Sequence, residues 1–295
     1  MAADRLIEVN AGAVRQALAR SFTSLERNGH TWRGTVGLGD TVVEADVLTL
    51  QSGSAYVLVS SDCTAARPVD GPLARLLVIE NSETVLGRFT EIEGRIRAEN
   101  AILAGATMAS VEVQSTVWTV GWTANAFGPR LAALMAEQTP VPPAPRPPAA
   151  TRRDAADHVV MTTERVRRFL GERFGGFDHD PNWGFHGAFG SARVFVDVLP
   201  VLEDSTAVRA SSPVLSDVDL GDDLALRLVE LTVRSPFGRF GYVPSRREVW
   251  FEHAILGDDL DQIELESAIT VVADVADGND DELAGSFGGR RYADL

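Results

Sequence analysis

The sequence contains no lysine and only one cysteine, Cys63. A single cysteine has no partner for an internal disulfide, which fits a reducing compartment. No apolar run approaches the roughly 18 residues that span a bilayer. The first five residues contain no apolar signal core. These absences predict a cytoplasmic protein that does not insert into a membrane.

Positive charge is also scarce. The 295 residues include 42 Asp and Glu against 27 Arg, which gives a formal net charge of −15. Nucleic-acid binding needs a basic face and is therefore not expected. An acidic protein favours partners that are basic or partly basic. The acidic residues are densest between Asp258 and Glu282, where no arginine occurs and where we expect a solvated helix face.

Sequence motifs of common catalytic sites are missing. There is no Walker-type phosphate loop, no HExxH and no GxSxG, and the glycines between Gly34 and Gly39 lead into no helix. Cys63 has no histidine near it in the sequence to act as a base, so a plain small residue is the simpler interpretation. We therefore expect no enzyme and no cofactor.

One cluster resembles a metal site. Asp178, His179, Asp180 and His186 lie within nine residues and carry side chains that bind divalent metals. Their spacing matches no zinc or calcium loop, and the first half of the chain has no counterpart. A loop whose Asp and Asn side chains form turns is the favoured interpretation. A metal-dependent enzyme that uses this cluster is the less favoured alternative.

The chain contains a long repeat. Leu73–Phe89 reads LARLLVIENSETVLGRF, and Leu224–Phe240, 151 residues later, reads LALRLVELTVRSPFGRF. Glu99–Leu103 (ENAIL) is answered by Glu252–Leu256 (EHAIL). A repeat of this period indicates two copies of one domain. The shared residues are mainly apolar or glycine, so we expect no motif of ionisable residues to repeat with them.

A proline-rich segment separates the copies. Residues 139–153 begin TPVPPAPRPPAA, a composition that favours an extended, semi-rigid linker. The predicted domains are therefore residues 1–138 and 154–295.

Both halves show the same order of predicted elements. Tight turns join the strands, so the sequence predicts an α+β fold of two tandem α-β-β-β-α-β-β-α domains, each a mostly antiparallel sheet with helices on one face. Pro72–Glu80 is a predicted short helix. Thr107–Phe127 is rich in β-branched residues and could pass for a strand. Its counterpart in the second half has apolar residues at helical spacing after a capping-box-like start at Asp261 and Glu264, and it predicts a helix. By the repeat, Thr107–Phe127 is then also a helix, with Trp118 and Trp122 on one side. Residues 285–295 are expected to be loose.

Aromatic residues in the predicted sheets are the candidates for a binding site. Core packing explains most of them, but helices cover only one face of such a sheet, and an exposed apolar face could hold an extended peptide. The candidate peptide-binding residues are Trp32, Phe89, Trp183, Phe237, Phe240 and Trp250.

The second half carries a recognisable pattern. It consists of the helix Leu224–Val233, the strand start Gly238-Arg239-Phe240, the strand Glu248–Leu256, and a closing helix with Asp280–Leu283. In these features Asp222–Leu283 resembles the YbjN and type III secretion (CesT-like) chaperone superfamily. The first half resembles it more weakly, as in tandem actinobacterial members. The resemblance implies peptide or protein binding without catalysis, often in dimers packed through the middle helix.

Two functions follow as hypotheses. The first is a non-enzymatic chaperone or adaptor that holds an extended segment of a client protein, either as a homodimer or as a pseudo-dimer of its two domains. The alternative is an assembly or regulatory scaffold of a secretion or envelope system.

Overall fold

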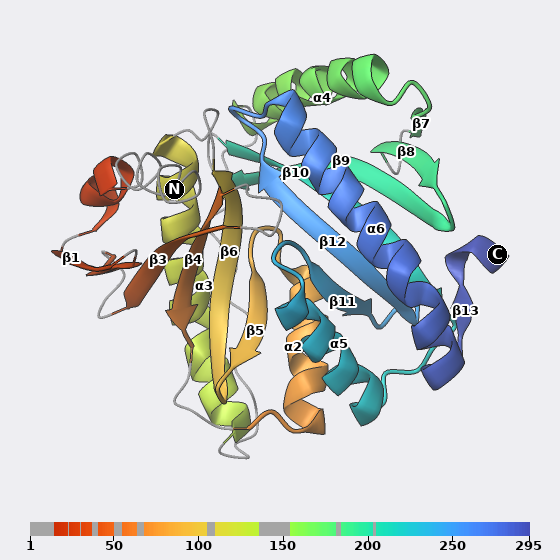
Figure 1. Cartoon of the computed structure of the whole chain (residues 1–295), viewed down its shortest axis with the longest axis horizontal. Coiled ribbons are helices and arrows are strands. Elements are labelled where there is room, and N and C mark those ends of the chain that lie inside the picture. Colours follow the sequence, from red (N-terminus) through yellow and green to blue (C-terminus); the bar gives the residue numbers. More distant parts are fainter. Residues whose placement is uncertain are drawn as a thin grey trace. The chain divides into compact units, whose positions relative to one another are not determined.

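The protein is described from a computed structural model of the chain (Figure 1). The described residues are 15–22, 24–29, 31–36, 41–49, 55–63, 68–104, 110–135, 154–180, 184–202 and 205–295. They form two compact units that do not follow the order of the chain. Unit 1 contains Met1–Val69 and Leu86–Pro145, and unit 2 contains Asp70–Val85 and Arg146–Leu295.

Unit 1 is an antiparallel sheet packed on one long helix. The strand order is β1-β2-β3-β4-β6-β5. The bounds are β1 (Ser24–Asn28), β2 (Thr31–Thr35), β3 (Val42–Thr49), β4 (Ala55–Asp62), β5 (Arg88–Ile92) and β6 (Arg95–Ala104). The helix is α3 (Ser110–Met135), and its buried face rests on β3, β4 and β6. This confirms the predicted helix, and Trp118 and Trp122 stack on it with ring centroids 6.5 Å apart.

The apolar core of unit 1 lies between the sheet and α3. Phe89 packs edge-on against Phe127 with ring centroids 5.0 Å apart. A Cβ at Gly121 would lie 3.2 Å from Val43, so the helix approaches β3 closely there. Since side chains alternate along a strand, Arg88 and Glu44, the neighbours of Phe89 and Val43, lie on the sheet face away from α3.

Unit 2 is built around a larger antiparallel sheet, with the order β11-β12-β10-β9-β8-β7. The bounds are β7 (Asp178–Asp180), β8 (Gly184–Phe189), β9 (Ala192–Leu202), β10 (Ser205–Ser216), β11 (Arg239–Val243) and β12 (Glu248–Leu256). A short strand, β13 (Arg290–Arg291), pairs with β10 outside this order. The two antiparallel sheets, with similar α-β units in tandem, confirm the predicted α+β class.

Two helices cover one face of this sheet. They are α4 (Asp154–Arg173) and α6 (Gln262–Phe287), and Figure 1 shows α6 lying across β9, β10 and β12. The α6 start is a capping box, as the sequence predicted: the Asp261 carboxylate accepts from the Glu264 N–H at 2.8 Å, and Glu264 accepts from the Asp261 N–H at 3.0 Å.

Two further helices of unit 2 flank the outer edge of β11. They are α2 (Gly71–Glu83) and α5 (Asp222–Arg234), the two copies of the repeated middle helix. Ser82 Oγ of α2 donates to the Tyr242 carbonyl at 2.9 Å. Thr232 Oγ1 of α5 accepts from the Phe240 N–H at 3.0 Å, and Asn81 of α2 donates to the Phe240 carbonyl at 3.3 Å. The edge of β11 is thereby closed to another strand.

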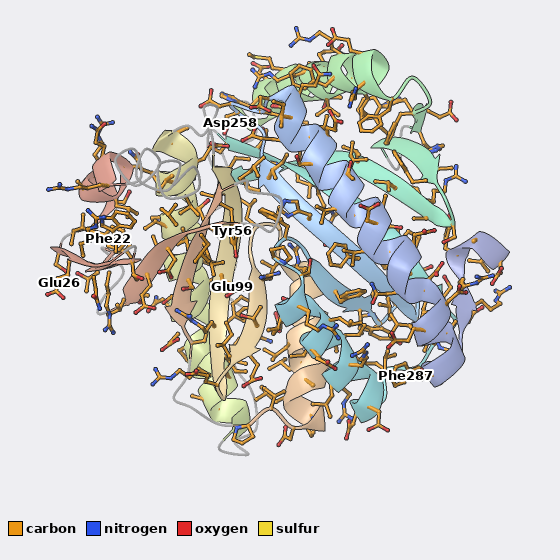
Figure 2. The ribbon with its side chains drawn as sticks, viewed as in Figure 1. Phe22, Glu26, Tyr56, Glu99, Asp258 and Phe287 are labelled. Atoms are coloured by element: carbon orange, nitrogen blue, oxygen red, sulfur yellow. The ribbon has the colours of Figure 1, made fainter. Side chains whose placement is uncertain are left out.

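The segment after α6 differs from its prediction. Helix α6 continues to Phe287, whose side chain is labelled in Figure 2. The chain then forms β13 and a short 3-10 helix, η1 (Tyr292–Asp294). The expectation of a loose segment was wrong, because its contacts are with residues distant in sequence. The predicted domain boundaries stay a prediction.

Candidate functional site

The repeat does contain ionisable residues, contrary to our expectation. Arg88 pairs with Glu99 in unit 1, with Nη2 and Oε1 2.7 Å apart, and both side chains are buried. Arg239 pairs with Glu252 in unit 2, with Nη2 and Oε2 3.1 Å apart, and both are again buried. Each pair joins directly opposite residues of neighbouring strands. The Arg of the Gly-Arg-Phe motif and the Glu before Ala-Ile-Leu are thus one repeated buried ion pair.

In unit 2 the pair also holds a helix end. Arg239 Nε donates to the Asn81 carbonyl at 2.6 Å, and its Nη2 donates to the Thr84 carbonyl, so a cation sits at the carboxyl end of α2. Burial raises the pKa of Glu252, and the guanidinium of Arg239 opposes that rise. Both side chains are buried, so the pair stabilises the fold and does not face a ligand in solvent.

Each ion pair belongs to a row of directly opposed residues across its sheet, on one face. Row 1, in unit 1, is Arg88, Glu99, Ser60, Glu44 and Arg33. Row 2, in unit 2, is Arg239, Glu252, Ser211, Phe195 and His186. The first three positions carry the same residue types and the last two do not. The two copies therefore share a scaffold and present different side chains beside it.

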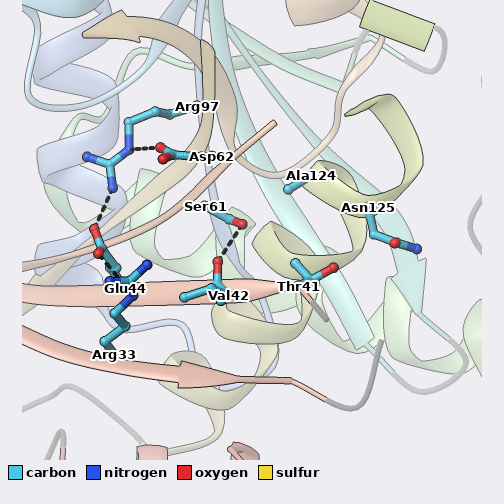
Figure 3. Close-up of a pocket in the computed structure, with 9 residues that line it drawn as sticks. All are labelled: Arg33, Thr41, Val42, Glu44, Ser61, Asp62, Arg97, Ala124 and Asn125. Atoms are coloured by element: carbon cyan, nitrogen blue, oxygen red, sulfur yellow. Dashed lines mark hydrogen bonds and ion pairs between the residues drawn. The ribbon is translucent and has the colours of Figure 1, made fainter. Parts of the chain in front are cut away.

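Row 1 ends in a charged pocket of about 260 Å³ (Figure 3). Its lining residues are Arg33, Thr41, Val42, Glu44, Ser61, Asp62, Arg97, Ala124 and Asn125. Arg97 Nη2 lies 2.9 Å from Glu44 Oε2 and 2.7 Å from Ser60 Oγ. The nearest approach of Arg97 to Asp62, from Nε to Oδ1, is 3.2 Å. Two arginines and two carboxylates largely neutralise one another in this pocket.

The charged pocket shows no nucleophile with a base. The Ser61 hydroxyl donates to the Val42 carbonyl at 2.7 Å, so it makes its bond to the backbone. No histidine lines the described pocket. Burial raises the pKa of the nearby Cys63 thiol to about 12, which leaves the thiolate scarce at neutral pH. These groups can position a polar ligand, and they lack the arrangement that acyl transfer needs.

Row 2 carries rings where row 1 carries charges. The rings of His186 and Phe195 have centroids 6.0 Å apart, and those of Phe195 and Trp250 are 5.8 Å apart. Trp250 stands on β12, where unit 1 has Arg97 on β6. Arg246 lies over the Trp250 ring at 5.9 Å, and Arg193 Nη2 is 3.0 Å from His186 Nδ1. We name His186, Phe195 and Trp250 the aromatic row.

The predicted peptide-binding residues are mostly buried. Exposure is 1% for Trp32, 2% for Phe89, 7% for Phe237, 0% for Phe240 and 8% for Trp250. Trp183 lies outside the described residues. The five described residues pack as core side chains, which is the explanation that the sequence favoured for most of these aromatic residues. Only Trp250 belongs to the aromatic row, and peptide binding by the others stays a prediction.

The predicted metal cluster forms a hairpin. Asp178 pairs with His186 and His179 with Phe185, so His179 points to the opposite face from Asp178 and His186. The His179 ring packs on Phe185 with centroids 4.9 Å apart. Among the described residues, no group of three or more His, Cys, Asp and Glu could hold a metal ion.

Sequence reasoning named Trp250 and His186 separately, but it missed Phe195, which lies between them, and the repeated ion pair. The signal for the ion pair was present, because Arg and Glu occupy matching positions in both copies of the repeat. No sequence pattern pointed to Phe195, because its ring partners His186 and Trp250 lie on other strands. Within the described part of the chain, every helix is too short or too polar to cross a membrane.

The chain was compared with families of known proteins. Residues 155–295 match the family model described as T3SS (YopN, CesT) and YbjN peptide-binding chaperone 1. No curated protein matches the chain.

Proposed function

Because the second half of the chain, residues 155–295, belongs to the family of T3SS and YbjN peptide-binding chaperones, we propose that this protein is a non-enzymatic chaperone or adaptor. It holds an extended segment of a client protein, and it does so in the cytoplasm. The observation that carries the proposal is the aromatic row, which lies in the half that matches the family.

The aromatic row is suited to an extended peptide. Phe195 and His186 are half-buried, so each offers a ring surface while remaining fixed by its neighbours. Aromatic side chains provide a large contact area at a low cost in conformational entropy. Arg193 and Asp178 are exposed on the strands beside the row and can orient polar groups of a bound backbone. A site of this kind binds without any reacting group.

A photo-crosslinking side chain tests this proposal. We would place it at Ala188, exposed on β8 two residues from His186, and place a matched one at Met161, exposed on α4. Clients should crosslink from position 188 and not from position 161. A synthetic peptide spanning the crosslinked segment should then bind the native chain, and Phe195→Ser should weaken its affinity at least about tenfold. Equal crosslinking from both positions would count against this site.

The helix pair at β11 supports a second part of the proposal. The resemblance implied dimers packed through the middle helix, and α2 and α5, the two middle helices of this chain, lie together in unit 2. Arg75 of α2 forms an ion pair with Asp222 of α5. We propose that this pair replaces the contact between two subunits, so the protein is a monomer. Light scattering that gives twice the mass of 31.7 kDa would contradict it.

A further inference from the structure

The segment after α6 lies on the sheet beside the aromatic row. We name Gly288–Leu295 the docked segment. Strand β9 pairs with β10 from Ser205 only as far as Ser211, and β10 continues to Ser216. Arg291 pairs with Leu215 and Arg290 with Ser216 along this continuation. The segment thus adds a strand where β9 leaves β10 unpaired.

Three side chains of the docked segment make specific contacts. Arg290 Nη2 is 2.6 Å from Asp217 Oδ2. Arg291 forms ion pairs with Asp281 and Asp294. The Tyr292 ring meets Phe195 of the aromatic row edge-on, with centroids 6.4 Å apart. The backbone pairing and the two basic side chains therefore lie along the short strand β13, and the ring follows directly, at the first residue of η1.

A close backbone approach brings the segment to this position. Gly289 has φ +84, and a Cβ there would lie 2.8 Å from the Ser216 carbonyl oxygen. A residue with a side chain at 289 would therefore push the segment away from β10. At Gly285, by contrast, an added Cβ would have no atom within 4 Å, so a side chain could be accommodated there. Docking of the segment depends on the glycine at 289.

We propose that the docked segment occupies the client site as a tethered ligand. The proposal rests on the proposed function and names the chemistry of the client: an extended stretch with two consecutive basic residues followed by an aromatic residue. It pairs with Leu215 and Ser216 of β10, places its basic groups at Asp217 and Asp281, and lays its ring on Phe195. Peptide binding by strand addition draws its affinity from the backbone and its specificity from such side-chain positions.

Charge and exposure explain why a client can displace the segment. Ion pairs between exposed side chains contribute little to stability, and Arg290 and Asp217 are both more than half exposed. Tethering gives the segment a high effective concentration at its site. A client must therefore make the same contacts and additional ones. The net charge of −15 favours a basic client over an acidic one.

A full-length variant with a released segment tests the proposal. In Arg290→Glu, Arg291→Glu and Tyr292→Ser combined, the site should be open. A fluorescent peptide with the native sequence GGRRYADL should bind this variant at least about tenfold more tightly than it binds the native chain, measured by anisotropy. Adding Phe195→Ser should remove the gain. The matched control carries Arg167→Glu and Arg168→Glu on α4, and it should behave like the native chain.

A second measurement uses the native chain, in case the variant fails to fold. An excess of the unlabelled peptide should speed amide hydrogen exchange at residues 290–292, because it displaces the segment. Equal peptide affinity of native and released chains, or exchange unaffected by peptide, overturns the proposal. If clients still crosslink from position 188 in that case, the chaperone function stands and only the tethered ligand is lost.

Discussion

Row 1 and row 2 show how one scaffold came to present two chemistries. Both rows begin with a buried arginine, glutamate and serine on three neighbouring strands. Row 1 then continues with Glu44 and Arg33 into a charged pocket, whereas row 2 continues with Phe195 and His186. The shared residues are those that bury a charge pair, and the differing ones lie nearer to solvent.

The comparison teaches which positions of the repeat are shared by the copies and which differ. A buried ion pair tolerates little substitution, because removing one partner leaves the other charge buried and uncompensated. Half-exposed positions on the same row are free to diverge. The neighbouring position also differs between the copies: Arg97 in unit 1 corresponds to the buried Trp250 in unit 2. Substitutions that treat the copies as equivalent will show where the equivalence ends.

The largest expected effect comes from Arg239→Met. This change leaves the buried Glu252 with only the longer ion pair to Arg209, at 3.9 Å, and it removes the donor to the Asn81 carbonyl of α2. We expect a loss of about 3–5 kcal/mol in the free energy of unfolding, measured by urea denaturation. Hydrogen exchange should show α2 losing protection.

Arg239→Met combined with Glu252→Leu should recover part of this loss, since no charge is then stranded. The same pair of experiments at Arg88 and Glu99 measures whether the two ion pairs are energetically equal. A cost below about 1 kcal/mol at Arg239 would show that the buried pair does not hold unit 2 together.

The second largest loss of stability is expected at the glycine of the Gly-Arg-Phe motif. Gly238 has φ +75, and a Cβ would lie 2.7 Å from the Glu252 carbonyl oxygen and 2.6 Å from the Phe251 ring. Gly238→Ala should cost about 3 kcal/mol from strain and overpacking, by the same denaturation assay. Gly87→Ala should cost less, because its nearest atom is 3.0 Å away.

Gly278→Ala is the matched control for both glycines. It lies within α6, and a Cβ there meets nothing within 4 Å. It should be neutral or stabilise by up to about 1 kcal/mol. A similar cost at all three positions would refute the close approach of strand and glycine.

The position after Phe240 separates the copies. Gly241 stands where unit 1 has the buried Thr90, and a Cβ at 241 would lie 2.9–3.0 Å from Ser82 of α2. Gly241→Ala should cost about 1–2 kcal/mol, and Gly241→Thr, which imports the residue of the other copy, should cost more. Hydrogen exchange in α2 should rise in the same order. Unchanged exchange would mean that α2 does not press on β11.

The smallest effect is expected at Cys63, whose counterpart in unit 2 is Val214. Because burial raises the thiol pKa to about 12, the native protein should react with iodoacetamide far more slowly than a free cysteine at pH 8. Cys63→Val should change the free energy of unfolding by less than about 1.5 kcal/mol. Rapid labelling of the folded chain would contradict the burial of the thiol.

Local patterns predicted the elements well and their partners poorly. The helix over α3 and the Asp261 capping box follow from spacing and end residues, and both were confirmed. The apolar face of α2 predicted only that it must be buried, not against which sheet. The sequence held one indication of the sheet that α2 contacts: unit 2 has Gly241 where unit 1 has Thr90, and a Cβ at 241 would meet Ser82 of α2.

The docked segment was missed for a related reason. Gly288 and Gly289 followed by two arginines is a composition typical of loose chain. The carboxylate of Asp217, which pairs with Arg290, lies 73 residues away in sequence. Contacts of this separation leave no periodic pattern, and neither did the ring contact of Tyr292 with Phe195.

The position of α2 has a consequence for how the protein is made. Asn81 leaves the ribosome 158 residues before Arg239, which binds its carbonyl. At about 5–20 residues per second, this helix waits on the order of 10–30 s for its sheet. During that time its apolar face is available to other proteins in the cell. The protein, itself a proposed chaperone, therefore needs its helix α2 to be protected from other proteins until synthesis of β11 is complete.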